Sequence, residues 1–183
     1  MWDTSVKMIG LAMKADDLSK IPEYELPKEY SWRYYEPGDE RIWAEIETSA
    51  GEFARVEDGI AAFHRYYPDE TLLPGRMIFL TDGGRPFATA TAWLSDSDPS
   101  EGRLHWVSVD QAHQGKRLSG PLVSLAMHRM RDLGYQTAYL TTQTASWVAI
   151  KVYSQFGFRA DVREEREIEG WKIVEEKTRL KFL

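Results

Sequence analysis

Residues 102–120 read GRLHWVSVDQAHQGKRLSG, and this stretch decides the fold. Its first half alternates apolar and polar residues as a strand does, and from Leu118 to Leu133 apolar residues recur at helical spacing. A strand that runs through a glycine-containing turn directly into a helix favours anion binding, because unpaired N–H groups and the positive end of the helix dipole face the turn. Lys116 and Arg117 add positive charge there. An ordinary strand-to-helix turn is the alternative, and the spacing fits neither a P-loop nor a dinucleotide fingerprint.

The elements around this stretch predict an α/β fold with a mixed sheet. We expect a helix from Gly38-Asp39, a helix over 56–67, strands over 77–80, 86–94 and 102–109, a helix over 118–133, a strand over 137–142, a helix over 146–156, and a closing hairpin of 160–168 and 171–182. Residues 1–30 contain Pro22 and Pro27 and show no sustained periodicity. They are expected to form an extended N-terminal arm on a domain of residues 31–183.

Composition limits the classes of function. The 183 residues are 43% hydrophobic and 28% charged, as in a soluble globular domain, and the absence of cysteine excludes disulfides, thiolate metal sites and a cysteine nucleophile. A net charge of −6 argues against a nucleic-acid partner. No apolar run approaches the roughly 18 residues of a membrane span, so we expect a cytoplasmic enzyme with no membrane partner. No metal site is predicted.

Two motifs resemble the GCN5-related N-acetyltransferase (GNAT) family. The first, Gln/Arg-x-x-Gly-x-Gly/Ala after a strand, matches Gln114, Gly115, Lys116, Arg117, Leu118 and Ser119, with Arg117 in place of glycine and Ser119 in place of glycine or alanine. The second matches Ser146, Ala149, Tyr153, Gly157 and Phe158, with Ser146 in place of asparagine. Because arginine is strained at positive φ, we expect a right-handed backbone at Arg117, with Gly120 providing the freedom.

The resemblance implies a GNAT (acyl-CoA N-acyltransferase) fold, in which two central parallel strands splay apart and helices flank the sheet. It implies acetyl-CoA as the co-substrate, without a metal, and direct transfer of the acetyl group to a primary amine of a small molecule or peptide, with no covalent intermediate. The residues implied for acetyl-CoA binding are Val107, Val109, Gln114, Gly115, Lys116, Arg117, Leu118, Ser119, Gly120, Ser146 and Ala149. Tyr153 is implied to protonate the departing thiolate.

The general base has no such signature. His105 lies on the strand two residues before Val107 and titrates near neutral pH, so it is one candidate, and Glu47 is another. Glu45, Glu52, Asp110 and a bound water remain alternatives. The tryptophans on apolar stripes, Trp43, Trp93, Trp106 and Trp147, are assigned to the core.

Three functions therefore stay open. The preferred one is an N-acetyltransferase with acetyl-CoA and an amine acceptor as partners. The second is an acyl-CoA-binding sensor or interaction module that has lost catalysis, and the third is a nucleotide-binding domain unrelated to CoA. The acceptor and the oligomeric state, including a homodimer, are not decided by the sequence.

Overall fold

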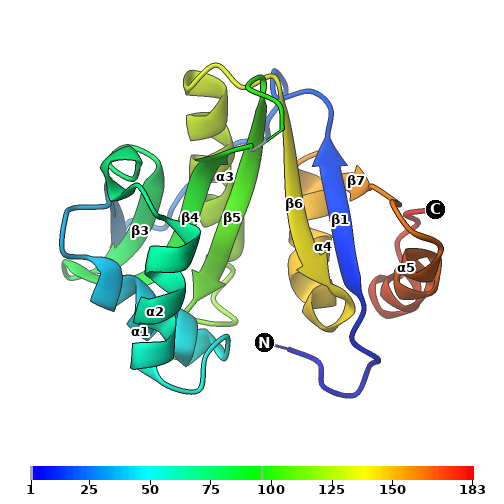
Figure 1. Ribbon diagram of the computed structural model, residues 1–183, viewed down its shortest axis with the longest axis horizontal. Helices are drawn as coiled ribbons and strands as arrows, with labels where there is room; N and C mark the ends of the chain where they lie inside the picture. The colour runs from blue at the N-terminus through cyan, green and yellow to red at the C-terminus, as the bar shows by residue number, and fades with distance from the viewer. Residues whose placement is uncertain (1, 96) are drawn as a thin grey trace.

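The computed structural model describes residues 2–95 and 97–183. A mixed sheet with the strand order β2-β3-β4-β5-β6-β1-β7 forms its centre (Figure 1). The elements are β1 (Gly10–Ala15), β2 (Tyr30–Tyr34), α1 (Glu40–Ala50), α2 (Val56–Tyr66), the 3-10 turn η1 (Glu70–Leu72), β3 (Met77–Asp82), β4 (Arg85–Leu94), β5 (Glu101–Val109), α3 (Ser119–Asp132), β6 (Thr137–Gln143), the 3-10 turn η2 (Thr144–Ser146), α4 (Trp147–Gln155), β7 (Arg159–Ala160) and α5 (Glu165–Thr178). The expected mixed sheet is confirmed.

Helices cover both faces of the sheet (Figure 1). α1 and α2 pack over β3 to β5 through an aromatic cluster that includes Trp43, Phe63, Tyr67 and Trp93. α3 and α4 lie on the opposite face, where Leu122, Met127 and Ile150 join a larger apolar cluster. Each helix therefore buries one apolar stripe, as the periodicity predicts.

The sheet separates into two halves at β5 and β6. All other neighbouring strands pair antiparallel, whereas β5 and β6 pair in parallel and only over Glu101–Arg103 with Thr137–Tyr139. Figure 1 shows the two strands close together at this end and parted at their carboxyl ends. The expected splayed parallel strands are confirmed.

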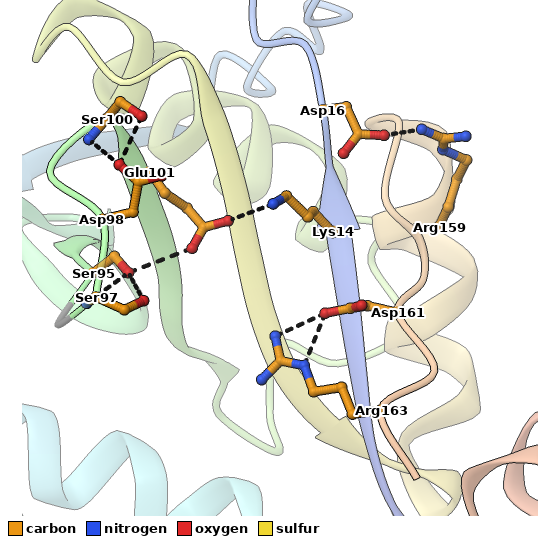
Figure 2. A network of polar contacts seen from close by, with 10 residues as sticks. All are labelled: Lys14, Asp16, Ser95, Ser97, Asp98, Ser100, Glu101, Arg159, Asp161 and Arg163. Atoms are coloured by element: carbon orange, nitrogen blue, oxygen red, sulfur yellow. Dashed lines mark hydrogen bonds and ion pairs between the residues drawn. The ribbon is translucent and has the colours of Figure 1, made fainter. Parts of the chain in front are cut away.

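Polar contacts hold the closed end of the two strands together. The Lys14 ammonium on β1 reaches across β6 to Glu101 on β5, 3.2 Å from its carboxylate oxygen (Figure 2). The Ser95 hydroxyl donates to the other oxygen of Glu101 at 3.4 Å. Because the Glu101 carboxylate is largely buried, this paired arrangement fixes the point from which the strands diverge.

The first thirty residues are not simply an arm on the surface. Gly10–Ala15 form β1, which lies inside the sheet between β6 and β7. Leu11 and Met13 point into the larger core and Ala12 is also buried. The interpretation as an arm is wrong for this segment, because a strand buried on both faces gives a short apolar run without alternation.

The prediction of a closing hairpin over 160–168 and 171–182 is also wrong. After the two-residue strand β7 the chain forms helix α5, whose buried residues Gly170, Trp171 and Val174 follow a helical spacing. A Cβ on Gly170 would lie 2.9 Å from the Leu11 side chain. The glycine that resembles a turn signal therefore lets α5 approach β1.

Candidate functional site

The parted strands open a cleft of 410 Å³ between the two halves of the sheet. A β-bulge sets the local shape of β5: the pairing with β4 shifts between Thr89 and Thr91, and Trp106 has φ +48°. Lining residues from β5, β6, α3 and α4 include Arg103, His105, Trp106, Val107, Ser108, Val109, Gln114, Ser119, Thr141, Gln143, Ser146, Ala149, Val152 and Tyr153. Trp106 packs against Trp43 and Phe53 of the aromatic cluster, as its pattern predicts, and it also lines this cleft.

The turn between β5 and α3 presents unpaired amides. Within residues 2–95 and 97–183, the backbone N–H groups of residues 115–120 donate no hydrogen bond to a protein atom. Gly115 has φ +79° and Arg117 has φ +61°. The Gln114 side-chain amide donates to the carbonyl of Val109 at 3.0 Å and ties the turn to the end of β5. Residues 115–120, which we call the amide cradle, thus present free donors at a helix N-terminus, an arrangement that suits an anion.

The right-handed backbone expected at Arg117 is wrong. Its φ lies in the left-handed region, which costs a non-glycine residue about 1 kcal/mol. The side chain is exposed, so no neighbouring atom adds a steric penalty. The turn therefore keeps a left-handed residue here although glycine is absent.

The residues expected to bind acetyl-CoA divide into two sets. Val107, Val109, Gln114, Ser119, Ser146 and Ala149 line the cleft. Gly115, Lys116, Arg117, Leu118 and Gly120 belong to the amide cradle beside it. The Leu118 side chain is buried in the core, so only its backbone can meet a ligand. Their assignment to acetyl-CoA stays a prediction.

Tyr153 on α4 lines the cleft and is 8% exposed. Burial, reinforced by the negative charges of Glu52 and Glu47, raises the pKa of its phenol well above the ordinary value. The phenol therefore keeps its proton at neutral pH, although the same shift makes it a weaker acid than an exposed tyrosine.

Glu47 on α1 is buried and is hydrogen-bonded to a residue of the cleft. The Ser108 hydroxyl donates to its Oε2 at 2.5 Å, while its Oε1 is buried without a partner among the described residues. Burial raises the pKa of Glu47 to about 8. A carboxyl group with this pKa exchanges its proton near physiological pH.

His105 has the opposite shift. Burial, with a smaller effect from the Arg103 charge, lowers the pKa of its imidazole to about 3. The ring packs edge-on against Tyr66, Tyr67 and Trp106. His105 lines the cleft but is a weak proton acceptor, and this geometry favours Glu47 over His105.

Sequence patterns did not single out several residues of the cleft. Trp2 and Tyr66 line it beside Glu52, which the sequence named only as an alternative base, and the Trp2 indole donates to Glu52 at 3.0 Å. Asp3 anchors the same segment to the other half of the sheet, because its carboxylate accepts hydrogen bonds from Trp147 and from Lys177. The first residues thus bridge the parted end of the cleft, and no local signal in the sequence announces contacts of this range.

The residues at the site fit the groups of acetyl-CoA. The amide cradle offers unpaired donors for a pyrophosphate, and the parted strands offer free edges for a pantetheine arm. In the described part of the chain, no group of three or more His, Asp or Glu side chains is arranged to hold a metal ion. No helix there is long and apolar enough to span a membrane.

The sequence profile of the Acetyltransferase (GNAT) family matches residues 21–158, more than half of the chain. The chain belongs to the GNAT acetyltransferase family. The mycothiol acetyltransferase of Corynebacterium aurimucosum is 28% identical over an alignment of 103 residues that covers 52% of this chain and 34% of that protein. The mycothiol acetyltransferase of Kytococcus sedentarius is 24% identical over 151 residues, 79% of this chain and 50% of that protein.

Solved structures show the same GNAT fold. A GCN5-related N-acetyltransferase from Sphaerobacter thermophilus superposes with a TM-score of 0.68 at 19% identity, covering 83% of this chain and 48% of that chain. The present chain spans half or less of the length of the two mycothiol acetyltransferases. These likenesses place the chain in the GNAT family and leave its acceptor open.

Proposed function

We propose that the protein transfers an acetyl group from acetyl-CoA directly to a primary amine of a small molecule or peptide. One observation carries the proposal: the cleft between β5 and β6 is lined by Ser119 of the amide cradle, by Tyr153 and by Ser108, whose hydroxyl donates to the buried Glu47. An anion site, a proton donor and a proton acceptor in one cleft are the parts that this transfer needs.

The cofactor half of the site consists mainly of backbone. The amide cradle would hold the pyrophosphate, and the edges of Val107 and Val109, freed where the strands part, would hold the pantetheine arm. Ser146 and Ala149 line the cleft on the side of α4. When bound, acetyl-CoA supplies the electrophilic thioester carbonyl.

Ser108 and Glu47 provide the route by which the amine loses its proton. The Ser108 hydroxyl lines the cleft and already donates to Glu47, so it can accept a proton from the amine as it passes its own to the carboxylate. A pKa of about 8 leaves part of Glu47 ionised at neutral pH. Tyr153 would donate a proton to the departing sulfur.

Calorimetry with acetyl-CoA tests the cofactor half. Binding with micromolar affinity is expected, and binding that disappears when acetyl-CoA is replaced by acetate would locate the recognition in the nucleotide portion. No binding at millimolar acetyl-CoA would contradict both the enzyme and the sensor. Binding without thiol release over a broad panel of amines would favour the sensor.

Tyr153→Phe tests the chemical half. Loss of the proton donor should lower kcat by about 100-fold or more with acetyl-CoA affinity little changed. Tyr35→Phe is the matched control, because Tyr35 is equally buried but lies in the aromatic cluster beneath α1 and α2. Equal turnover by the two variants would remove the role given to Tyr153.

A further inference from the structure

The acceptor side of the cleft contains one cation and one anion that do not pair with each other. Arg103 and Glu52 both line the cleft, yet among the described residues neither forms an ion pair within 4.0 Å. Among residues 2–95 and 97–183, the Glu52 carboxylate accepts a hydrogen bond only from the Trp2 indole N–H. Opposite charges that share a cleft and stay apart suit a ligand that carries both signs itself.

The Arg103 side chain is held in place by its neighbours, but not all of its N–H groups have hydrogen-bond acceptors. It extends from β5, its Nη2 donates to the Thr141 hydroxyl at 3.3 Å, and its guanidinium carbon lies 5.7 Å from the centre of the Tyr139 ring. Its Nε is buried without a hydrogen-bond partner in the described part of the chain. A buried donor on a charged group without a partner is costly, and a planar anion would remove that cost.

The neighbouring Arg163 shows the contrast. Its guanidinium carbon lies 5.9 Å from the same Tyr139 ring, but its side chain pairs with Asp161 at 2.7 Å (Figure 2). Arg163 does not line the cleft. The two arginines therefore share one aromatic support and differ in their access to a ligand.

We propose, on the basis of the acetyltransferase function above, that the acceptor carries a carboxylate as well as its primary amine, and that Arg103 binds this carboxylate. The ammonium form of the acceptor would be attracted by the carboxylate of Glu52, and Trp106 and Tyr66, which contact each other, add aromatic surface to the same cleft. The guanidinium fork can bind a carboxylate through two parallel hydrogen bonds, and the negative charge of Glu52 would repel a phosphate dianion more strongly than a carboxylate. An amino acid has this arrangement of charges.

Matched acceptor pairs test the proposal. Thiol release is measured with L-phenylalanine against L-phenylalaninamide and with L-leucine against L-leucinamide, and rates are referred to the concentration of unprotonated amine. The wild-type protein should favour the carboxylates by about 10- to 100-fold in kcat/KM. Glucosamine 6-phosphate and glucosamine form the corresponding pair for a phosphate. If the preference in kcat/KM is larger in this pair than in the carboxylate pairs, the proposal of a carboxylate is wrong.

Three variants distinguish carboxylate binding by Arg103 from a structural role of that residue. Arg103→Gln should lose the preference for the carboxylate mainly through KM, and Arg103→Lys should restore part of it. Arg163→Gln should keep it, although the Tyr139 ring loses a cation in both cases. If Arg103→Gln slows carboxylates and amides equally, Arg103 is only structural and the proposal fails.

Different results would contradict the acetyltransferase function and the carboxylate-bearing acceptor. Absence of acetyl-CoA binding, or of turnover with every amine, removes the acetyltransferase function and this inference with it. Turnover of amines without a preference for carboxylates removes the inference alone.

Discussion

Replacing Glu47 with glutamine should make the protein more stable at alkaline pH and less active as the proposed enzyme. Glu47 is fully buried, no cation pairs with it among the described residues, and its Oε1 lacks a hydrogen-bond partner. Ionising such a carboxyl group in the folded protein is unfavourable. Glutamine keeps the size of the side chain and can still accept the Ser108 hydroxyl, but it never carries the charge.

The magnitude follows from the two pKa values. Burial raises the pKa of Glu47 from about 4.5 in the unfolded chain to about 8 in the fold. The folded protein therefore keeps a proton that the unfolded chain releases, so the free energy of unfolding falls as the pH rises from 4.5 through 8. The whole effect is on the order of 5 kcal/mol, of which about 4 kcal/mol accumulates between pH 5 and pH 9.

Urea unfolding across this pH range measures the effect. The difference in free energy of unfolding between Glu47→Gln and wild type should grow with pH, because titrating groups that do not interact with Glu47 contribute equally to both proteins. Glu45→Gln, on the exposed side of the same helix, should show a small and constant difference. A difference for Glu47→Gln that stays constant from pH 5 to pH 9 would refute the reasoning.

Three further predictions follow from other features. Gly170→Ala should lower the free energy of unfolding, measured in urea, by about 1 kcal/mol. The new Cβ meets Leu11 at 2.9 Å, and the gain in helix propensity offsets only part of this overpacking. An unchanged free energy would show that α5 can move away from β1 without cost. Arg117→Gly should raise that free energy by about 0.5 kcal/mol because strain at positive φ is removed, while calorimetry should show weaker acetyl-CoA binding because a cation leaves the cradle. The NMR signals of the His105 ring should stay those of a neutral imidazole from pH 5 to pH 9, since the pKa is about 3; a titration near pH 6.5 would restore His105 as a candidate base.

The residues proposed for the cofactor could be grouped from the sequence because they lie in short, local motifs. The turn that joins β5 to α3 and the residues of α4 lie within two short segments, and the structure places Gln114, Ser146 and Tyr153 on one cleft as their patterns suggested. Strands and helices with clear periodicity were predictable for the same reason. β1 was not, because a short apolar strand shows its place only when β6 and β7 lie beside it.

The acceptor half is formed by contacts between distant segments. Ser108 and Glu47 are 61 positions apart and Trp2 and Glu52 are 50 apart, so no motif records either pair. Their chemistry also depends on burial: the same carboxyl group is unremarkable on the exposed face of α1 and has a pKa of about 8 on the buried face. Sequence alone therefore named Glu47 without a reason to prefer it to His105.

Arg117 shows what the first motif encodes physically. The resemblance places glycine there, and the sequence led us to expect that arginine would change the backbone conformation. The backbone instead stays left-handed at a cost of about 1 kcal/mol. The amides of the cradle can converge only if the chain turns in this way between β5 and α3, so the turn requires a positive φ, and glycine is only the least costly residue to supply it.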